Sequence, residues 1–294
     1  MRLDGFIVST IVSPFVSVFA SLFVSLFFST ICFSVELNVL PNKNNTLERR
    51  LLQFENDNLK QSALLVIGSP NKLKSDTLIV MAHGFHPDPS QYGRVETGAS
   101  FRPGDYYRAW VNAYAKAGFN VLVPDYRGHN DSEGAIYPKQ AGKVALQERL
   151  YSSDLIAATH ALEHYLSTEF QNIVLIGHSM GGPISFYAAS QIEAISQIKT
   201  ISRTKNKVKL VSLWSTAKYR LPKINVSPNY VIHHAKYDVI TPISNIDFYL
   251  KNHKQQLIST FLYGSEQHML SADDFEQAVS TDIQLIREID NGNQ

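Results

Sequence analysis

The feature that most constrains the fold is a regular alternation of short apolar segments with longer helical patterns, beginning near residue 77. The short segments are almost wholly apolar, which is typical of strands buried on both faces of a sheet. We expect such strands at 77–82, 119–124, 172–176, 208–214, 230–234 and 257–263. Helices are predicted at 103–117, 144–170 (with a break near Ser152), 180–200, 242–252 and 272–289. Strands joined by helices pair in parallel through right-handed crossovers.

Two further apolar-rich runs, at 47–54 and 59–67, precede this alternation and flank Asn56-Asp57-Asn58. Turn residues between two strand-like runs predict a hairpin. We therefore expect an α/β fold with a mostly parallel central sheet, helices on both faces and an antiparallel hairpin at the N-terminal edge. Because no internal repeat or linker divides the body, residues 35–294 are predicted to form one domain.

The N-terminal segment has the features of an export signal. Residues 6–35 carry no charge and are rich in Phe, Val, Ile and Leu; Arg2 precedes them and a polar run follows. Residues 1–34 are predicted to be a signal peptide cut after Ser34, or a membrane anchor, because the stretch is long enough to span a bilayer. In both cases we expect the body outside the cytoplasm, either periplasmic or secreted, or attached to a membrane through residues 6–35.

Composition excludes several classes of function. The chain has 294 residues, of which 44% are hydrophobic and 18% charged, which argues against disorder, and its net charge of +1 gives no electrostatic basis for binding nucleic acid. Cys32 is the only cysteine, so no disulfide or cysteine-based zinc site is expected in the body. His160 and His164 have helical spacing, but no carboxylate completes a metal site with them. We expect neither a metal nor a cofactor.

The segment Gly177-His178-Ser179-Met180-Gly181 joins the predicted strand at 172–176 directly to a predicted helix. Such a turn forces Ser179 into a strained backbone conformation, and side chains at positions 177 and 181 would collide with it. The serine hydroxyl would then lie above the carboxyl edge of the sheet, beside the N-terminus of a helix. Ser179 is therefore predicted to be a nucleophile, which needs a base within hydrogen-bond reach.

With these residues, the sequence resembles the α/β-hydrolase superfamily over about residues 47–289. Three further stretches carry the resemblance: His83-Gly84-Phe85, the segment 125–134, and the pair Asp238 and His268. In the second stretch, Asn130 stands where the family often has glycine. The branches it most resembles are the serine aminopeptidase-like, prolyl-oligopeptidase-like and dienelactone hydrolase-like hydrolases.

The resemblance implies the site residues. The family order is serine, acid, histidine, so His268 is the expected base and Asp238, which follows the strand at 230–234, the expected acid. The implied oxyanion hole consists of the backbone N–H groups of Phe85 and Met180.

Two other residues fit these roles less well. His253 is a weaker candidate for the base, and Asp247 is expected to point elsewhere from inside the following helix. The remaining histidines near tight turns and strand ends are expected to be structural, namely His83, His178, His233 and His234.

Only residues 215–229 lie where many relatives insert a lid, so we expect a minimal lid and an open site, with access shaped by the loop 86–105. Three hypotheses on function stay open. The first is hydrolysis of carboxylic esters through an acyl-enzyme. The second is hydrolysis of amide bonds in short peptides. The third is an exported binding protein that kept the fold and lost activity.

Overall fold

The computed structural model describes residues 35–40, 47–68, 76–85, 107–135, 143–199, 207–224 and 227–292. All of them belong to one unit of the chain, Ser34–Gln294. The predicted signal or anchor segment, 1–34, lies outside the described residues, as does the access loop from residue 86 onward. No helix within these described ranges combines the length and the apolar character that crossing a membrane requires.

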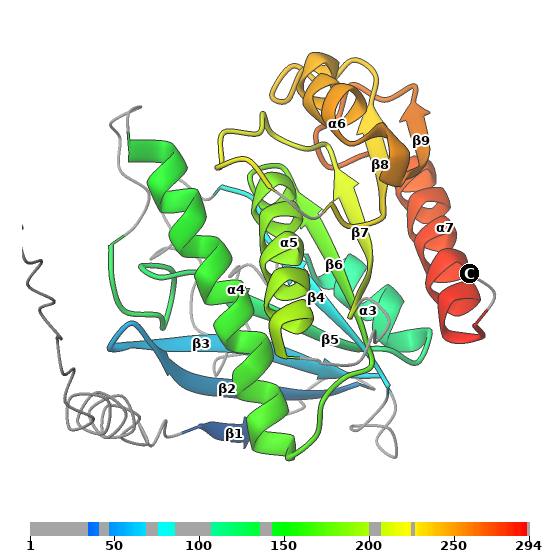
Figure 1. Cartoon of the computed structure of the whole chain (residues 1–294). Coiled ribbons are helices and arrows are strands. Elements are labelled where there is room, and N and C mark those ends of the chain that lie inside the picture. Colours follow the sequence, from blue (N-terminus) through cyan, green and yellow to red (C-terminus); the bar gives the residue numbers. More distant parts are fainter. Residues whose placement is uncertain are drawn as a thin grey trace, which may run out of the picture. The chain divides into compact units, whose positions relative to one another are not determined.

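A nine-stranded sheet forms the centre of this unit, in the order β1-β2-β3-β5-β4-β6-β7-β8-β9 (Figure 1). The six strands from β4 to β9 pair in parallel with one another. They are β4 (Thr77–Ala82), β5 (Asn120–Asp125), β6 (Asn172–His178), β7 (Val208–Trp214), β8 (Tyr230–Ala235) and β9 (Leu257–Tyr263). Each lies within a few residues of its predicted range, so the mostly parallel α/β sheet is confirmed.

The N-terminal edge of the sheet is antiparallel. The predicted hairpin consists of β2 (Glu48–Asn56) and β3 (Leu59–Ile67), and β3 also pairs antiparallel with β5. Asp57 and Asn58 have φ values of 53° and 59°, which matches the twist of a two-residue hairpin turn. A further strand, β1 (Glu36–Val39), pairs with β2 and was not predicted, because it is short and mostly exposed and so has no apolar run.

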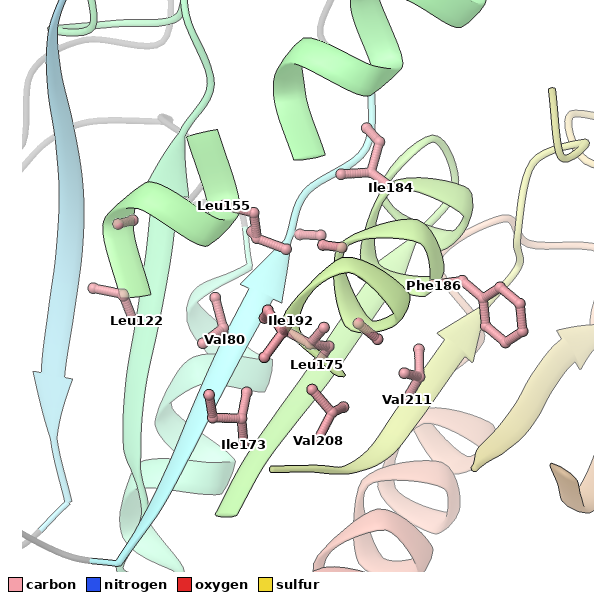
Figure 2. Close-up of a cluster of buried hydrophobic side chains, with 14 of the residues drawn as sticks. Val80, Leu122, Leu155, Ile173, Leu175, Ile184, Phe186, Ile192, Val208 and Val211 are labelled. Carbon is pink, nitrogen blue, oxygen red and sulfur yellow. The ribbon is translucent and has the colours of Figure 1, made fainter. Parts of the chain in front are cut away.

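Helices cover both faces of the sheet (Figure 1). Within the described ranges the α-helices are α3 (Arg108–Lys116), α4 (Val144–Leu166), α5 (Gly181–Lys199), α6 (Asp247–Asn252) and α7 (Ala272–Asp290). Alternate residues of β4 contribute to two different cores. Val80 packs with the α4 and α5 side, where Figure 2 shows it near Leu155, Leu175 and Ile192, whereas Met81 packs with α3 and α7. This alternation is expected for a strand that is buried on both faces.

Three of the predicted helices differ from the structure. The one predicted at 242–252 begins as a 3₁₀ turn at Ile243–Ile246, and only Asp247–Asn252 is α-helical. Helix α4 has no break at Ser152, because the Ser152 hydroxyl donates to the carbonyl of Glu148 one turn earlier and so stays compatible with the helix. The helix ends at Leu166, earlier than predicted, and Ser167 follows in the left-handed conformation with φ of 49°. Helix α3 begins at Arg108, and residues 103–106 of the predicted helix lie outside the described residues.

Candidate active site

The turn between β6 and α5 carries Ser179, as the sequence predicts. Strand β6 ends at His178 and α5 begins at Gly181, so only Ser179 and Met180 connect them. Ser179 has φ of 54°, a left-handed conformation that is uncommon for a residue with a side chain. Strain of this kind persists only where the surrounding structure enforces it, and it occurs often at functional sites.

Close packing around the turn explains its glycines. A Cβ atom on Gly177 would overlap the carbonyl oxygen of Gly181, and one on Gly181 would overlap the carbonyl oxygen of Ala82. The turn is therefore pressed against the carboxyl end of β4. Only glycine allows the strand to pass into the helix at this distance.

Hydrogen bonds fix the backbone of Ser179 to the end of β7. Its N–H donates to the carbonyl of Trp214 at 2.9 Å, and its carbonyl accepts from the N–H of Ala217 at 2.9 Å and that of Gly182 at 3.0 Å. The hydroxyl of Ser179 forms no hydrogen bond with any residue that the structure describes, and the residue is partly exposed. The backbone is thus held in place while the hydroxyl is not engaged by these residues.

Asp238 and His268 lie together. The Nδ1 atom of His268 donates to Asp238 Oδ2 at 2.7 Å. The same carboxylate accepts from the N–H groups of Ile240 (2.8 Å) and Thr241 (2.9 Å) and from the hydroxyl of Thr241 (2.6 Å). Burial alone would raise the pKa of Asp238, but the hydrogen bonds from His268 and Thr241 outweigh it and hold the pKa below its ordinary value. Asp238 is therefore ionised at neutral pH.

The loop after β9 brings His268 beside the turn that carries Ser179. The imidazole rings of His268 and His178 lie 4.6 Å apart, and the carbonyl of His268 accepts from Nε2 of His178 at 3.1 Å. No hydrogen bond joins His268 to the hydroxyl of Ser179 in this structure. Such bonds are often long in enzymes without substrate and shorten when substrate binds. With Nδ1 engaged by Asp238, Nε2 is the ring nitrogen of His268 left for proton exchange.

The segment after β4 also reaches Ser179. A Cβ atom on Gly84 would lie 3.2 Å from the Cβ atom of Ser179, so the backbone between His83 and Phe85 passes directly beside the nucleophile candidate. Met180 is buried at the start of α5, and no acceptor for its N–H is found in the described part of the chain. Phe85 is 52% exposed.

The weaker candidates lie elsewhere. His253 bonds to the hydroxyl of Ser227 at 2.6 Å and packs against Phe186 at 5.2 Å, while Asp247 forms an exposed ion pair with Lys251 at 3.6 Å. Over the ranges that the structure describes, no three His, Cys, Asp or Glu side chains gather as metal ligands would.

The segment 125–134 links the hairpin turn to helix α4. Arg127 forms a buried ion pair with Asp154 at 2.7 Å and also contacts Asp57 in the hairpin turn at 2.8 Å. Asn130, which stands where the family often has glycine, has φ of 49°. Asparagine tolerates this left-handed conformation better than most residues, which explains the replacement.

A second His–Asp pair lies deep in the core, and no sequence motif marks its carboxylate. Asp282 of α7 bonds to Nε2 of His233 at 3.0 Å. It also accepts from three other buried side chains, those of Tyr114, Ser212 and Trp214. The available signal was an aspartate within the buried stripe of α7, which otherwise consists of Ala278, Val279 and Ile286.

Comparisons with known proteins agree with this architecture. Among solved structures, a putative hydrolase from Legionella pneumophila matches with a TM-score of 0.60 and 13% identity, covering 82% of this chain and 90% of that chain. An esterase from Pyrococcus furiosus matches at 0.58 and 16%, covering 85% and 98%, and acetyl xylan esterase 1 from Thermoanaerobacterium sp. at 0.57 and 14%, covering 86% and 88%. At such low sequence identity, the structural similarity shows a shared fold alone.

No curated protein sequence matches this chain. The family model of the α/β hydrolase fold matches residues 77–225, which is just over half of the chain and runs from the start of β4 through the loop after β7. The chain belongs to the α/β hydrolase fold family.

Proposed function

We propose that the protein is a serine hydrolase in which Ser179 is the nucleophile, His268 the general base and Asp238 the acid of a catalytic triad. The observation that carries the proposal is the 2.7 Å bond between His268 and Asp238, formed beside a left-handed Ser179. A buried, ionised carboxylate holds one tautomer of the imidazole and stabilises its protonated form. The turn supplies a serine whose hydroxyl is not engaged by the described residues.

The proposed reaction begins when Nε2 of His268 takes the proton of the Ser179 hydroxyl. The serine oxygen then bonds to the carbonyl carbon of the substrate, and the carbonyl π electrons move to oxygen. The N–H groups of Met180 and Phe85 are proposed to donate to that oxyanion. When the tetrahedral intermediate collapses, the bond to the leaving group breaks and the leaving group takes the proton from His268. In the second half, Nε2 of His268 takes a proton from water and the water oxygen bonds to the acyl carbon. The bond from that carbon to Ser179 Oγ then breaks, and Oγ takes the proton back from His268.

Carboxylic esters are the proposed substrates. Two of the similar structures are esterases by name, and no helix or strand occurs in 215–224 or 227–229, the described parts of the segment where a lid could stand. An open site suits small soluble esters. The second candidate is hydrolysis of amide bonds in short peptides, for which the same triad would serve.

A fluorophosphonate probe tests the nucleophile. We expect the wild-type protein to take up one equivalent of probe at Ser179, and Ser179→Ala to take up none, because Ser179 Oγ is the atom that the probe phosphorylates. Persistent labelling of a folded Ser179→Ala protein would overturn the assignment. No labelling and no turnover in a folded wild-type sample would instead favour a binding protein of the same fold.

Substrate panels separate the two hydrolytic candidates. The ester proposal expects p-nitrophenyl esters of short acids to be turned over faster than aminoacyl anilides at matched concentration. The opposite ranking would favour a peptidase.

We also propose that the body acts outside the cytoplasm, on the strength of the uncharged segment 6–35 alone. Mass spectrometry of the protein recovered separately from the cell exterior, the membrane fraction and the cytosol tests this. A mature chain that begins near Val35 indicates cleavage, an intact chain in the membrane fraction indicates an anchor, and an intact cytosolic chain contradicts both.

A further inference from the structure

We propose that Tyr107 and His178 form a hydrogen-bonded relay that positions the backbone of Gly84 and of His268 around Ser179. Neither side chain is assigned a chemical step; both act through the groups that they hold. The inference rests on the proposed function, because it concerns the same site. It assigns a role to two buried residues that the triad does not use.

The relay runs through three hydrogen bonds, and the end groups determine the directions of two of them. The N–H of Gly84 can only donate, and it donates to the hydroxyl oxygen of Tyr107 at 2.9 Å. The carbonyl of His268 can only accept, so Nε2 of His178 carries a proton and donates to it at 3.1 Å. The third bond joins Nδ1 of His178 to the Tyr107 hydroxyl at 2.7 Å. In the tautomer of His178 with its proton on Nε2 alone, Nδ1 accepts from that hydroxyl, and all three bonds are satisfied together.

The relay joins three segments that are far apart in sequence. Gly84 precedes Phe85, the proposed oxyanion donor; His178 precedes Ser179; and His268 follows β9. Its two side chains are almost completely buried, Tyr107 at 1% and His178 at 3% exposure. Because a buried hydrogen bond cannot be replaced by water at low cost, these bonds hold the three backbones in one arrangement.

A second contact fixes the direction of the Phe85 N–H. Nδ1 of His83 bonds to the carbonyl of Gly84 at 2.8 Å, and a carbonyl accepts, so His83 donates. That carbonyl and the N–H of Phe85 belong to one planar peptide group, in which they point in opposite directions. Since Tyr107 holds the N–H of Gly84 and His83 holds its carbonyl, both peptide planes at Gly84 are fixed. The orientation of Phe85 N–H follows from them.

Packing leaves little space for this segment to adjust. A Cβ atom on Gly84 would lie 3.0 Å from the Tyr107 hydroxyl and 3.2 Å from Nδ1 of His178. The indole of Trp110 packs edge-on against the His178 ring at 5.3 Å. The relay is thus enclosed by protein, and we expect its loss to shift the backbone at Gly84.

The test compares two tyrosine-to-phenylalanine variants in the same helical region. Tyr107→Phe removes the hydroxyl of the relay. Tyr114→Phe removes a buried hydroxyl that bonds to Asp282 at 2.8 Å, so it is a matched control for the loss of a buried hydrogen bond. We expect Tyr107→Phe to lower kcat for a p-nitrophenyl ester by at least about tenfold while KM changes by less than about twofold, because misplaced donors weaken transition-state binding.

A boronic acid that forms a tetrahedral adduct with Ser179 gives a second readout. Its inhibition constant should rise in Tyr107→Phe by about the same factor as kcat falls, since both report on stabilisation of a tetrahedral, negatively charged centre. In Tyr114→Phe, kcat and the inhibition constant should stay close to wild type even where the melting temperature drops. Equal kcat and boronate affinity in the two variants would overturn the relay.

His178→Gln provides an independent variant if Tyr107→Phe folds poorly. Glutamine keeps a donor in reach of the His268 carbonyl but offers no acceptor at the place of Nδ1, so it breaks the bond to Tyr107. If the relay is correct, the double variant Tyr107→Phe/His178→Gln should be about as active as the less active of the two single variants. The reason is that both substitutions break the same hydrogen bond, the one between Tyr107 and His178. Multiplicative losses would contradict it. A wild-type protein without turnover or labelling ends both proposals, whereas an active wild type with an unaffected Tyr107→Phe ends only the relay.

Discussion

The two His–Asp pairs of this molecule show how the same contact serves different ends. In the first pair, His268 bonds to Asp238 through Nδ1 and its side chain is 15% exposed. In the second pair, His233 bonds to Asp282 through Nε2 and to the hydroxyl of Tyr263 through Nδ1, and both members are completely buried. A histidine with both nitrogens engaged and no access to solvent cannot exchange a proton with a substrate.

The second pair even includes a serine, because the hydroxyl of Ser212 donates to Asp282 at 2.8 Å. This serine bonds to the carboxylate instead of lying beside an open ring nitrogen, and it is fully buried. Residue types alone would therefore describe both clusters as Ser–His–Asp. Exposure and the bond made by the second ring nitrogen distinguish a reactive arrangement from a structural one.

The largest expected difference between the pairs is in activity. Asp238→Asn should lower kcat by about 10⁴-fold while the protein stays folded with a modest loss of stability, because an amide cannot hold the productive tautomer of His268 or stabilise its imidazolium. Ester turnover with the folded variant is the measurement. A loss of less than about tenfold would mean that another group supports His268, or that His268 is not the base.

Asp282→Ala should affect stability instead. The carboxylate accepts from Tyr114, Ser212, Trp214 and His233, so its removal leaves several buried donors without a partner. We expect the free energy of unfolding to fall by about 3–5 kcal/mol, the range for breaking a buried charged network. Denaturant titration measures it, and turnover per folded molecule should stay near wild type. A folded Asp282→Ala protein that has lost activity would show that the His233–Asp282 pair is not purely structural.

How far the sequence predicts these features depends on how local their causes are. The turn at Ser179 was predictable because Gly177 and Gly181 lie two residues to either side of it. Both positions require glycine, since a Cβ atom there would overlap neighbouring backbone. The strands were predictable because each is a short apolar run bounded by turn residues. Strand β1 has mostly exposed residues, so the hydrophobic pattern of the sequence does not indicate that it pairs with β2.

The network at Asp282 has no local signature. Its donors Tyr114 and Ser212 lie 168 and 70 residues away in sequence, and only the fold brings them to one carboxylate. The relay through Tyr107 and His178 has the same origin, since Gly84, Tyr107 and His268 come from three separate segments. Sequence order and motif positions predict the triad as a set of residues; its operation as a triad stays a prediction until it is tested.

A third buried carboxyl, Glu148, sharpens the comparison because it lacks such donors. It is 1% exposed, its Oε2 has no hydrogen-bond partner among the described residues, and Arg220 forms an ion pair with its Oε1 at 3.7 Å. Burial raises the pKa of Glu148 to about 7, and the charge of Arg220 offsets this only in part. The folded state therefore binds more protons than the unfolded state between the ordinary value of 4.5 and about 7.

Stability should consequently fall as pH rises through that window. We expect wild type to lose roughly 2–3 kcal/mol relative to Glu148→Gln between pH 4.5 and pH 8, the size expected from the shift in pKa. Denaturant titrations of both proteins across this range provide the measurement. Parallel curves would show that Glu148 finds a partner in solution that the described residues do not supply.

The smallest expected effect has the opposite sign and concerns Asp238. Because hydrogen bonds from His268 and Thr241 hold its folded-state pKa below the ordinary value of 3.8, the unfolded state binds the proton more readily. The stabilisation from Asp238 is complete above that ordinary value and disappears as pH falls through the lower folded-state pKa. Wild type should therefore be more stable than Asp238→Asn by a constant margin at neutral pH, and the margin should shrink only below about pH 4. A margin that shrinks already between pH 5 and 7 would mean that the folded-state pKa is raised, and Asp238 would then resemble Glu148 and not Asp282.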